Sequence, residues 1–187
     1  MPVFKEQITE QEAAARFVLS VMHETKGAWP NVYKSLRDTP GGKFAIENET
    51  MAIFDLSLAV LAQEVQALEN LFSREQAGRI YTWVLRCIDS PEYGEYTRRE
   101  VEEYREVFQK NIQAGENPLG AIPARLLHRW RGENIRNFEV EISGKKTGII
   151  SPLLVLHTMD ILISFIGIGR WKRIKENFEL IEGDLPL

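Results

Sequence analysis

Cysteine is almost absent from this sequence of 187 residues, in which Cys87 is the only one. A chain with a single cysteine forms no disulfide within itself, which excludes the small disulfide-rich secreted folds. Because Cys87 lies among the apolar residues of "IYTWVLRCI", we expect a buried, unreactive thiol in a reducing cytoplasm. The first residues, "MPVFKEQITE", also lack the cationic start and apolar run of a secretory signal.

The signatures of common catalytic and cofactor sites are missing as well. The chain has no Cys-x-x-Cys, no His-Glu-x-x-His, no Gly-x-Gly-x-x-Gly after a strand and no phosphate-binding Gly-x-x-x-x-Gly-Lys. None of the three histidines follows a glutamate by three positions, as helical di-iron sites require. The penicillin-binding triplet Lys146-Thr147-Gly148 overlaps the nearest Ser-x-x-Lys, so we interpret it as accidental. These absences predict no metal and no cofactor, and they favour a protein that is not an enzyme.

One long apolar run is present, over residues 149–169, with a single formal charge. Ser151-Pro152 is typical of a helix start and the two glycines after residue 166 of a helix end. The resulting helix of about 15 residues spans about 22 Å, less than the roughly 30 Å of a bilayer core. Asp160 would also lie near the bilayer centre, at a cost of about 2.5–3.5 kcal/mol. The run therefore predicts a buried helix and no membrane span.

Charge is divided unevenly along a chain whose net charge is −4. Residues 119–175 carry ten Lys/Arg and four Asp/Glu, a balance of +6, which leaves −10 for the rest. We therefore distinguish an acidic part, residues 1–118, from a basic part, residues 119–175, within one domain over residues 1–187. Such a division can attract an anionic partner, or the two parts can face each other within the fold or across a dimer. We favour the internal arrangement.

Helical periodicity dominates the remaining sequence. Capping boxes at Thr9–Glu12 and Ser73–Gln76 each start a helix. Apolar spacing and turn residues predict helices over about 10–26, within 29–38, over 48–72, 74–88, from 90 or 97 to 114, over 123–131, 152–166 and 170–181. The alternation in "FEVEIS", followed by "GKKTG" and "IIS", predicts a small β-hairpin over residues 138–150. The predicted fold class is mainly all-α, a single-domain bundle of about seven helices with this hairpin.

His157 and Asp160 are the first candidate catalytic residues. They are three positions apart on the apolar helix, so one polar line crosses an otherwise hydrophobic surface. A second such line on the helix over 48–72 contains Asp55. If the three side chains meet in the interior, the imidazole beside a buried carboxylate can act as an acid, a base or a metal ligand. The alternatives are exposure to solvent or an ordinary hydrogen bond in the core.

Two charged segments supply further candidates. Arginines surround Trp130, and a second basic group begins the last helix, a composition that can hold phosphates; the candidate anion-binding residues are Arg125, Arg129, Arg131, Arg170, Lys172 and Arg173. The acidic pI of the chain argues against nucleic acid, and a structural ion-pair surface is the simplest interpretation. The acid cluster "REVEEYRE" resembles the Mg²⁺-binding pairs of helical nucleotide pyrophosphatases, but no Glu-x-x-Asp accompanies it, so we expect a solvated helix face.

Together these features predict a cytoplasmic helical protein that acts through protein–protein contacts as a homo-oligomer. One alternative is an enzyme or small-ligand binder built on Asp55, His157 and Asp160. Another is a binder of small anions or, less favoured, nucleic acid through the arginine-rich segments.

Overall fold

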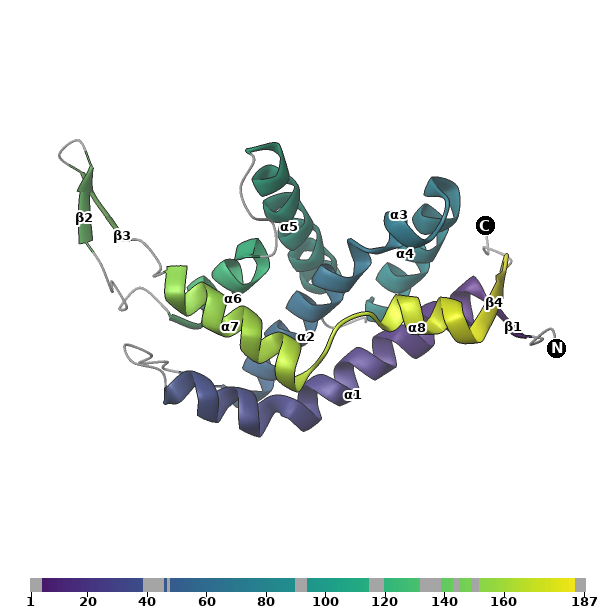
Figure 1. The fold of residues 1–187 in the computed structure, drawn as a ribbon, viewed down its shortest axis with the longest axis horizontal. Helices are drawn as coiled ribbons and strands as arrows, with labels where there is room; N and C mark the ends of the chain where they lie inside the picture. The colour runs from purple at the N-terminus through teal and green to yellow at the C-terminus, as the bar shows by residue number, and fades with distance from the viewer. Residues whose placement is uncertain are drawn as a thin grey trace.

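The computed structural model describes residues 5–38, 46, 48–89, 94–114, 120–131, 139–142, 145–148 and 152–183. The elements in these residues are β1 (Glu6–Thr9), α1 (Glu10–Arg37), α2 (Glu49–Val65), α3 (Leu68–Leu71), α4 (Arg74–Ile88), α5 (Gly94–Gln113), α6 (Ala121–Arg131), β2 (Glu139–Ile142), β3 (Lys145–Gly148), α7 (Pro152–Phe165), α8 (Arg170–Asn177) and β4 (Phe178–Ile181). The mainly all-α prediction is confirmed. Within the described ranges, six helices have eleven or more residues and two are shorter, close to the predicted seven (Figure 1).

Helix α1 starts where the sequence predicts but does not end there. The Thr9 hydroxyl accepts a hydrogen bond from the backbone N–H of Glu12, which confirms the N-cap. The predicted stop at Gly27 is wrong, because the helix continues through Pro30 to Arg37. A proline inside a helix removes a hydrogen bond and crowds the preceding turn. The buried side chains beyond Gly27, which include Trp29, Val32 and Leu36, continue the apolar stripe, and this packing outweighs the local signals. Figure 1 shows α1 changing direction near its middle.

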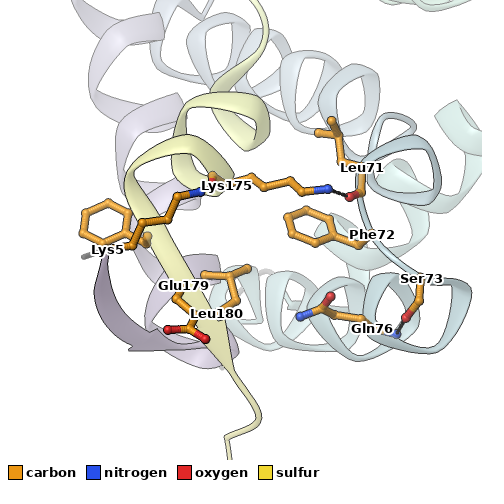
Figure 2. A pocket seen from close by; sticks show the side chains of 9 residues that line it. Lys5, Leu71, Phe72, Ser73, Gln76, Lys175, Glu179 and Leu180 are labelled. Carbon is orange, nitrogen blue, oxygen red and sulfur yellow. Dashed lines mark hydrogen bonds between the residues drawn. The ribbon is translucent and has the colours of Figure 1, made fainter. Parts of the chain in front are cut away.

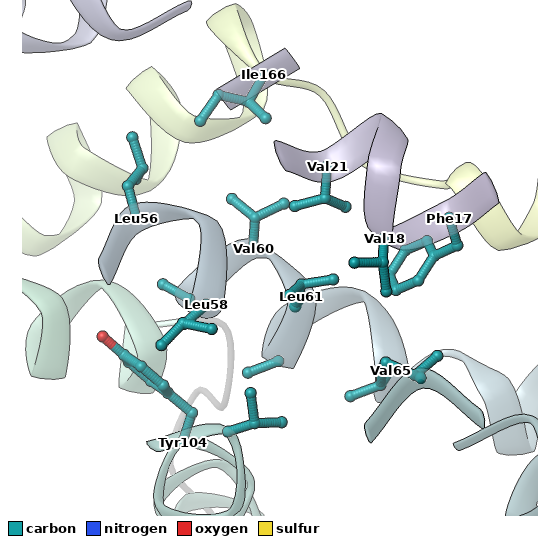
Figure 3. Close-up of a cluster of buried hydrophobic side chains, with 14 of the residues drawn as sticks. Phe17, Val18, Val21, Leu56, Leu58, Val60, Leu61, Val65, Tyr104 and Ile166 are labelled. Carbon is teal, nitrogen blue, oxygen red and sulfur yellow. The ribbon is translucent and has the colours of Figure 1, made fainter. Parts of the chain in front are cut away.

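Helix α2 is the central helix of the core. It begins after the N-cap Asn48, as predicted, but the expected helix over 48–72 breaks after Val65 and resumes as α3. Figure 3 shows apolar side chains of α2 packed toward α1, toward Tyr104 of α5 and toward Ile166. Among the described residues, the stretch Glu49–Leu71 has the length and hydropathy to cross a membrane, and 61% of its most apolar window is buried inside the fold. Core helices of soluble proteins pass the same test.

The two chain ends meet in a parallel strand pair that the local sequence signals did not predict. β1 pairs with β4 in a register that places Glu6 beside Phe178 and Ile8 beside Leu180 (Figure 1). The predicted helix over 170–181 is therefore wrong beyond Asn177. In its last four residues, "FELI", half-buried Phe178 and Leu180 alternate with exposed Glu179 and Ile181, which suits a strand with one side against the core. Because the strand is short, this alternation is hard to distinguish from the end of an amphipathic helix.

The β-hairpin is confirmed, with a shift of its second strand. β2 and β3 pair in antiparallel register, Glu139 beside Gly148 and Ile142 beside Lys145. The sequence pattern predicted the turn at "GKKTG" and the second strand at "IIS", whereas β3 is "KKTG" itself. Only two residues lie between the strands, the commonest connection length in hairpins.

Two predictions about burial are wrong. Cys87 is exposed, and so is Ile112, which the periodicity of α5 placed on the buried face. On α4 the buried stripe passes through Val84 and Ile88, four positions apart, and leaves Cys87 beside it. Apolar neighbours in the sequence did not place the thiol on the buried face of the helix.

Candidate functional site

A group of charged side chains lies between α2, α5 and α6. Asp55 of α2 is 8% exposed, and its carboxylate lies 2.9 Å from the guanidinium of Arg129 on α6. The same guanidinium contacts the carboxylate of Glu100 on α5 and donates a hydrogen bond to the Tyr96 hydroxyl. Tyr96 in turn donates to Asp55 at 3.3 Å. Arg129 thus connects three helices through two carboxylates and one phenol.

Arg125, one turn earlier on α6, extends this group. Its guanidinium lies 3.2 Å from the carboxylate of Glu100 and also contacts Glu103. The expectation that the acid cluster forms a solvated face is therefore wrong for Glu100, which is buried. We call these six residues the α2–α5–α6 network: Asp55, Tyr96, Glu100, Glu103, Arg125 and Arg129.

The electrostatics of this network favour a structural role. Burial raises the pKa of Asp55, while Arg129 and the hydrogen bond from Tyr96 lower it, and the net direction is upward. Both guanidinium groups already face carboxylates, so a bound anion would have to displace them. In the part of the chain that the structure describes, no group of three His, Cys, Asp or Glu side chains could hold a metal ion.

Tyr104 borders the network and provides a test of its packing. Its ring is 1% exposed, and its buried hydroxyl makes no hydrogen bond within the described residues. Replacing Tyr104 by phenylalanine should therefore raise the free energy of unfolding, by about 1 kcal/mol, because a buried hydroxyl without a partner destabilises the folded state. Urea unfolding followed by circular dichroism measures this change. A loss of stability would contradict the assignment and indicate that the hydroxyl has a partner.

A second buried charged group is centred on Arg170 at the start of α8. Arg170 is 2% exposed, and its guanidinium contacts the carboxylates of Glu64 on α2 and Glu24 on α1. Glu64 also accepts hydrogen bonds from the backbone N–H groups of Gly169 at 3.0 Å and Arg170 at 2.7 Å. A carboxylate in this position satisfies the free N–H groups of the first turn and interacts favourably with the helix dipole. Glu64 therefore caps α8 from another helix.

The predicted anion-binding residues have different environments. Arg125, Arg129 and Arg170 face carboxylates of the acidic part, as described above. Lys172 is exposed and lies 3.9 Å from Glu176, while exposed Arg173 donates to a backbone carbonyl at 3.3 Å. The side chain of Arg131 lies outside the described residues. Ion pairs between the basic and acidic parts support the interpretation that the two parts face each other within the fold.

The three predicted catalytic residues do not form one buried site. His157 and Asp160 are both exposed on α7, whereas Asp55 is buried against Arg129. Sequence reasoning thus assigned Asp55 and Arg129 to separate sites, although the structure pairs them. It also missed Glu64, whose partners are about a hundred positions later in the chain. The one usable signal was spacing, because Arg125 and Arg129 share a face of α6, as Glu100 and Glu103 do on α5.

Helix α7 exposes large hydrophobic side chains to solvent. Of the eight exposed large hydrophobic residues among those described, four lie in or just after this helix: Leu156, Ile163, Phe165 and Ile168. Figure 1 shows α7 on the near side of the molecule, with α1 and α6 beside it. Leu156, His157, Asp160 and Ile163 lie along one side of the helix, and we call these four residues the α7 face. The prediction that this apolar helix is buried is therefore correct for only part of its surface.

Hollows in the surface include an open groove and a small cavity beside α7. An open groove of about 620 Å³ lies between β4 and the start of α4 (Figure 2). Its two lysines are engaged, because Lys5 donates to the backbone carbonyl of Lys175 at 2.7 Å and Lys175 donates to that of Leu71. A cavity of about 70 Å³ lies between α2, α6 and α7, with side chains such as Ile122 and Leu162 in its wall. Ile163 of the α7 face also borders this cavity.

No protein-family profile, curated protein or solved structure matches this chain.

Proposed function

We propose that this protein acts through protein–protein contacts and associates with copies of itself through the α7 face. The observation that carries the proposal is the concentration of exposed hydrophobic side chains on and just after one helix. Single exposed hydrophobic residues are ordinary, whereas several that lie close together on the surface mark sites of association. The cavity beside Ile163 adds apolar surface at the edge of this face.

The other two hypotheses have less support. An enzyme built on Asp55, His157 and Asp160 needs these groups close together, and Asp55 is instead paired with Arg129. An anion binder needs accessible cationic groups, and three of the six candidate residues are occupied by carboxylates of the same chain. Self-association needs an exposed apolar surface, and Leu156 and Ile163 of α7 provide one.

Replacing Ile163 by glutamate tests this proposal. Ile163 is 44% exposed, so a charged side chain can be placed there without entering the core, but in an interface it would be buried without a partner. We expect the wild type to show a concentration-dependent rise in molar mass by light scattering, and the variant to remain monomeric over the same range.

Ile112→Glu is the matched control. Ile112 has the same side chain and a similar exposure, 47%, but lies near the end of α5. It should associate like the wild type. A wild-type protein that stays monomeric, or equal losses in both variants, would contradict the proposal.

A further inference from the structure

Two polar side chains on the exposed side of α7, His157 and Asp160, are placed symmetrically about the middle of the helix. The midpoint of the helix lies between Thr158 and Met159, so His157 and Asp160 lie at equal distances from it in opposite directions. Both side chains are exposed, and neither has a hydrogen bond or ion pair within the described part of the chain. One is a hydrogen-bond donor that can carry positive charge, and the other is a carboxylate. The centre of the face therefore carries two complementary groups related by reversal of the helix.

We propose that two copies of this protein pack α7 against α7 in antiparallel orientation, about a two-fold axis through this midpoint. The inference rests on the proposed function and assigns its geometry. In this arrangement the imidazole of His157 in each copy faces the carboxylate of Asp160 in the other. A two-fold interface repeats every contact, so the contact between His157 and Asp160 occurs twice in the dimer.

Hydrophobic positions fit the same operation. In the antiparallel pair, Leu156 of one copy lies at the height of position 161 of the other copy. That position is two residues, or about 3 Å along the helix axis, from Ile163. The two-fold axis repeats this contact on the other side. The exposed positions at 156, 157, 160, 163 and 164 follow the spacing of three and four residues that packed helices bury. The polar pairs then lie at the centre of the contact and the apolar pairs beside them. This order also disfavours the parallel arrangement, in which His157 would face His157 and Asp160 would face Asp160.

Charge variants test the register without altering the core. His157→Glu produces a chain with two acidic groups at the centre of α7. Asp160→Lys produces a chain with a histidine and a lysine there and no carboxylate. In the proposed dimer each variant alone brings like charges or unmatched groups together. We expect the dissociation constant of each homodimer, measured by sedimentation equilibrium, to rise about tenfold or more.

An equimolar mixture of the two variants should recover association. The glutamate introduced at position 157 of one chain would face the lysine introduced at position 160 of the other. The unchanged Asp160 of the first chain would face the unchanged His157 of the second, so both pairs become complementary. We expect a heterodimer with a dissociation constant within about threefold of the wild-type value, detected by native mass spectrometry. Glu106→Lys, an exposed charge reversal on α5, is the control and should associate like the wild type.

The outcomes separate this inference from the proposed function. If Ile163→Glu abolishes association but the two charge variants associate like the wild type, α7 is an interface in another register and the inference is overturned alone. A mixture that fails to recover association also overturns it. If the wild type is monomeric, the proposed function fails as well. Recovery in the mixture, with losses in both single variants, supports the antiparallel register.

Discussion

Replacing Arg170 by methionine is expected to lower the free energy of unfolding by about 3–5 kcal/mol. Methionine fills a similar volume but leaves Glu64 buried without its cationic partner, because the side chain of Glu64 is only 2% exposed. Removing one member of a buried ion pair is strongly destabilising, since the remaining charge has lost both water and its partner. Arg170 also donates to the backbone carbonyls of Ile166 at 3.0 Å and Gly167 at 3.1 Å, and these bonds are lost too. Urea unfolding followed by circular dichroism measures the change.

Two further variants isolate the cause. Lys172→Met removes an exposed charge from the same helix and should change the free energy by less than about 0.5 kcal/mol. Arg170→Met combined with Glu64→Gln should recover part of the loss. The amide oxygen of glutamine can still accept from the backbone of α8, and no buried charge remains unpaired. If Arg170→Met alone costs less than about 1 kcal/mol, the pair with Glu64 is not a main support of α8.

Local signals in the sequence predicted where several helices begin. The side chains of Thr9, Asn48 and Ser73 each accept a backbone N–H of the first helical turn. The end of α7 was also predictable, because Gly167 and Gly169 adopt φ angles of +75° and +90°, which residues with a Cβ rarely adopt. All these features depend on residues a few positions apart. That is why the sequence alone predicts them.

Tertiary packing decided the features that were not predicted. Gly27 and Pro30 are local signals for the end of a helix, yet buried Val32 and Leu36 extend α1 beyond them. Strand β4 forms by pairing with β1, which lies near the opposite end of the chain. Local propensity carries no information about such a partner. The same limit applies to the charged groups, because Glu64 and Arg170 are 106 positions apart.

The two buried charged groups anchor α6 and α8, which come before and after α7 in the chain. Arg129 connects α6, which precedes α7, to α2 and α5. Arg170 connects α8, which follows α7, to α1 and α2. Trp171, fully buried next to Arg170, packs its ring 4.5 Å from that of Phe17 and adds an apolar anchor. Helices α6 and α8 are thus tied to the core, and α7 itself packs against α1 and α6, so its exposed face has a defined orientation, as the proposed interface requires.

Replacing Arg129 by methionine should lower the free energy of unfolding by about 3 kcal/mol near pH 7, at the low end of the range for a broken buried pair. Asp55 and Glu100 both lose their bond to the guanidinium. The loss of stability should be smaller than for Arg170→Met. The side chain of Arg129 is 23% exposed, so in the variant water can partly solvate the carboxylates that have lost the guanidinium. Lys110→Met is the control on α5. The side chain of Lys110 is 73% exposed and lies 3.6 Å from Glu106, so its loss should cost less than about 0.5 kcal/mol.

The pH dependence of this loss distinguishes an electrostatic cause from a packing defect. Arg129 lowers the pKa of Asp55 against the stronger upward effect of burial, so removing Arg129 raises that pKa further above its ordinary value of 3.8. An acid with a higher pKa in the folded state binds its proton more tightly when folded, so its contribution to stability is present at low pH and is lost as the pH rises through the folded-state pKa. The deficit of Arg129→Met relative to the wild type should therefore be largest near pH 7 and shrink toward about pH 4. A deficit that stays constant across this interval would mean that Arg129 stabilises α6 through packing of its side chain and not through its charge.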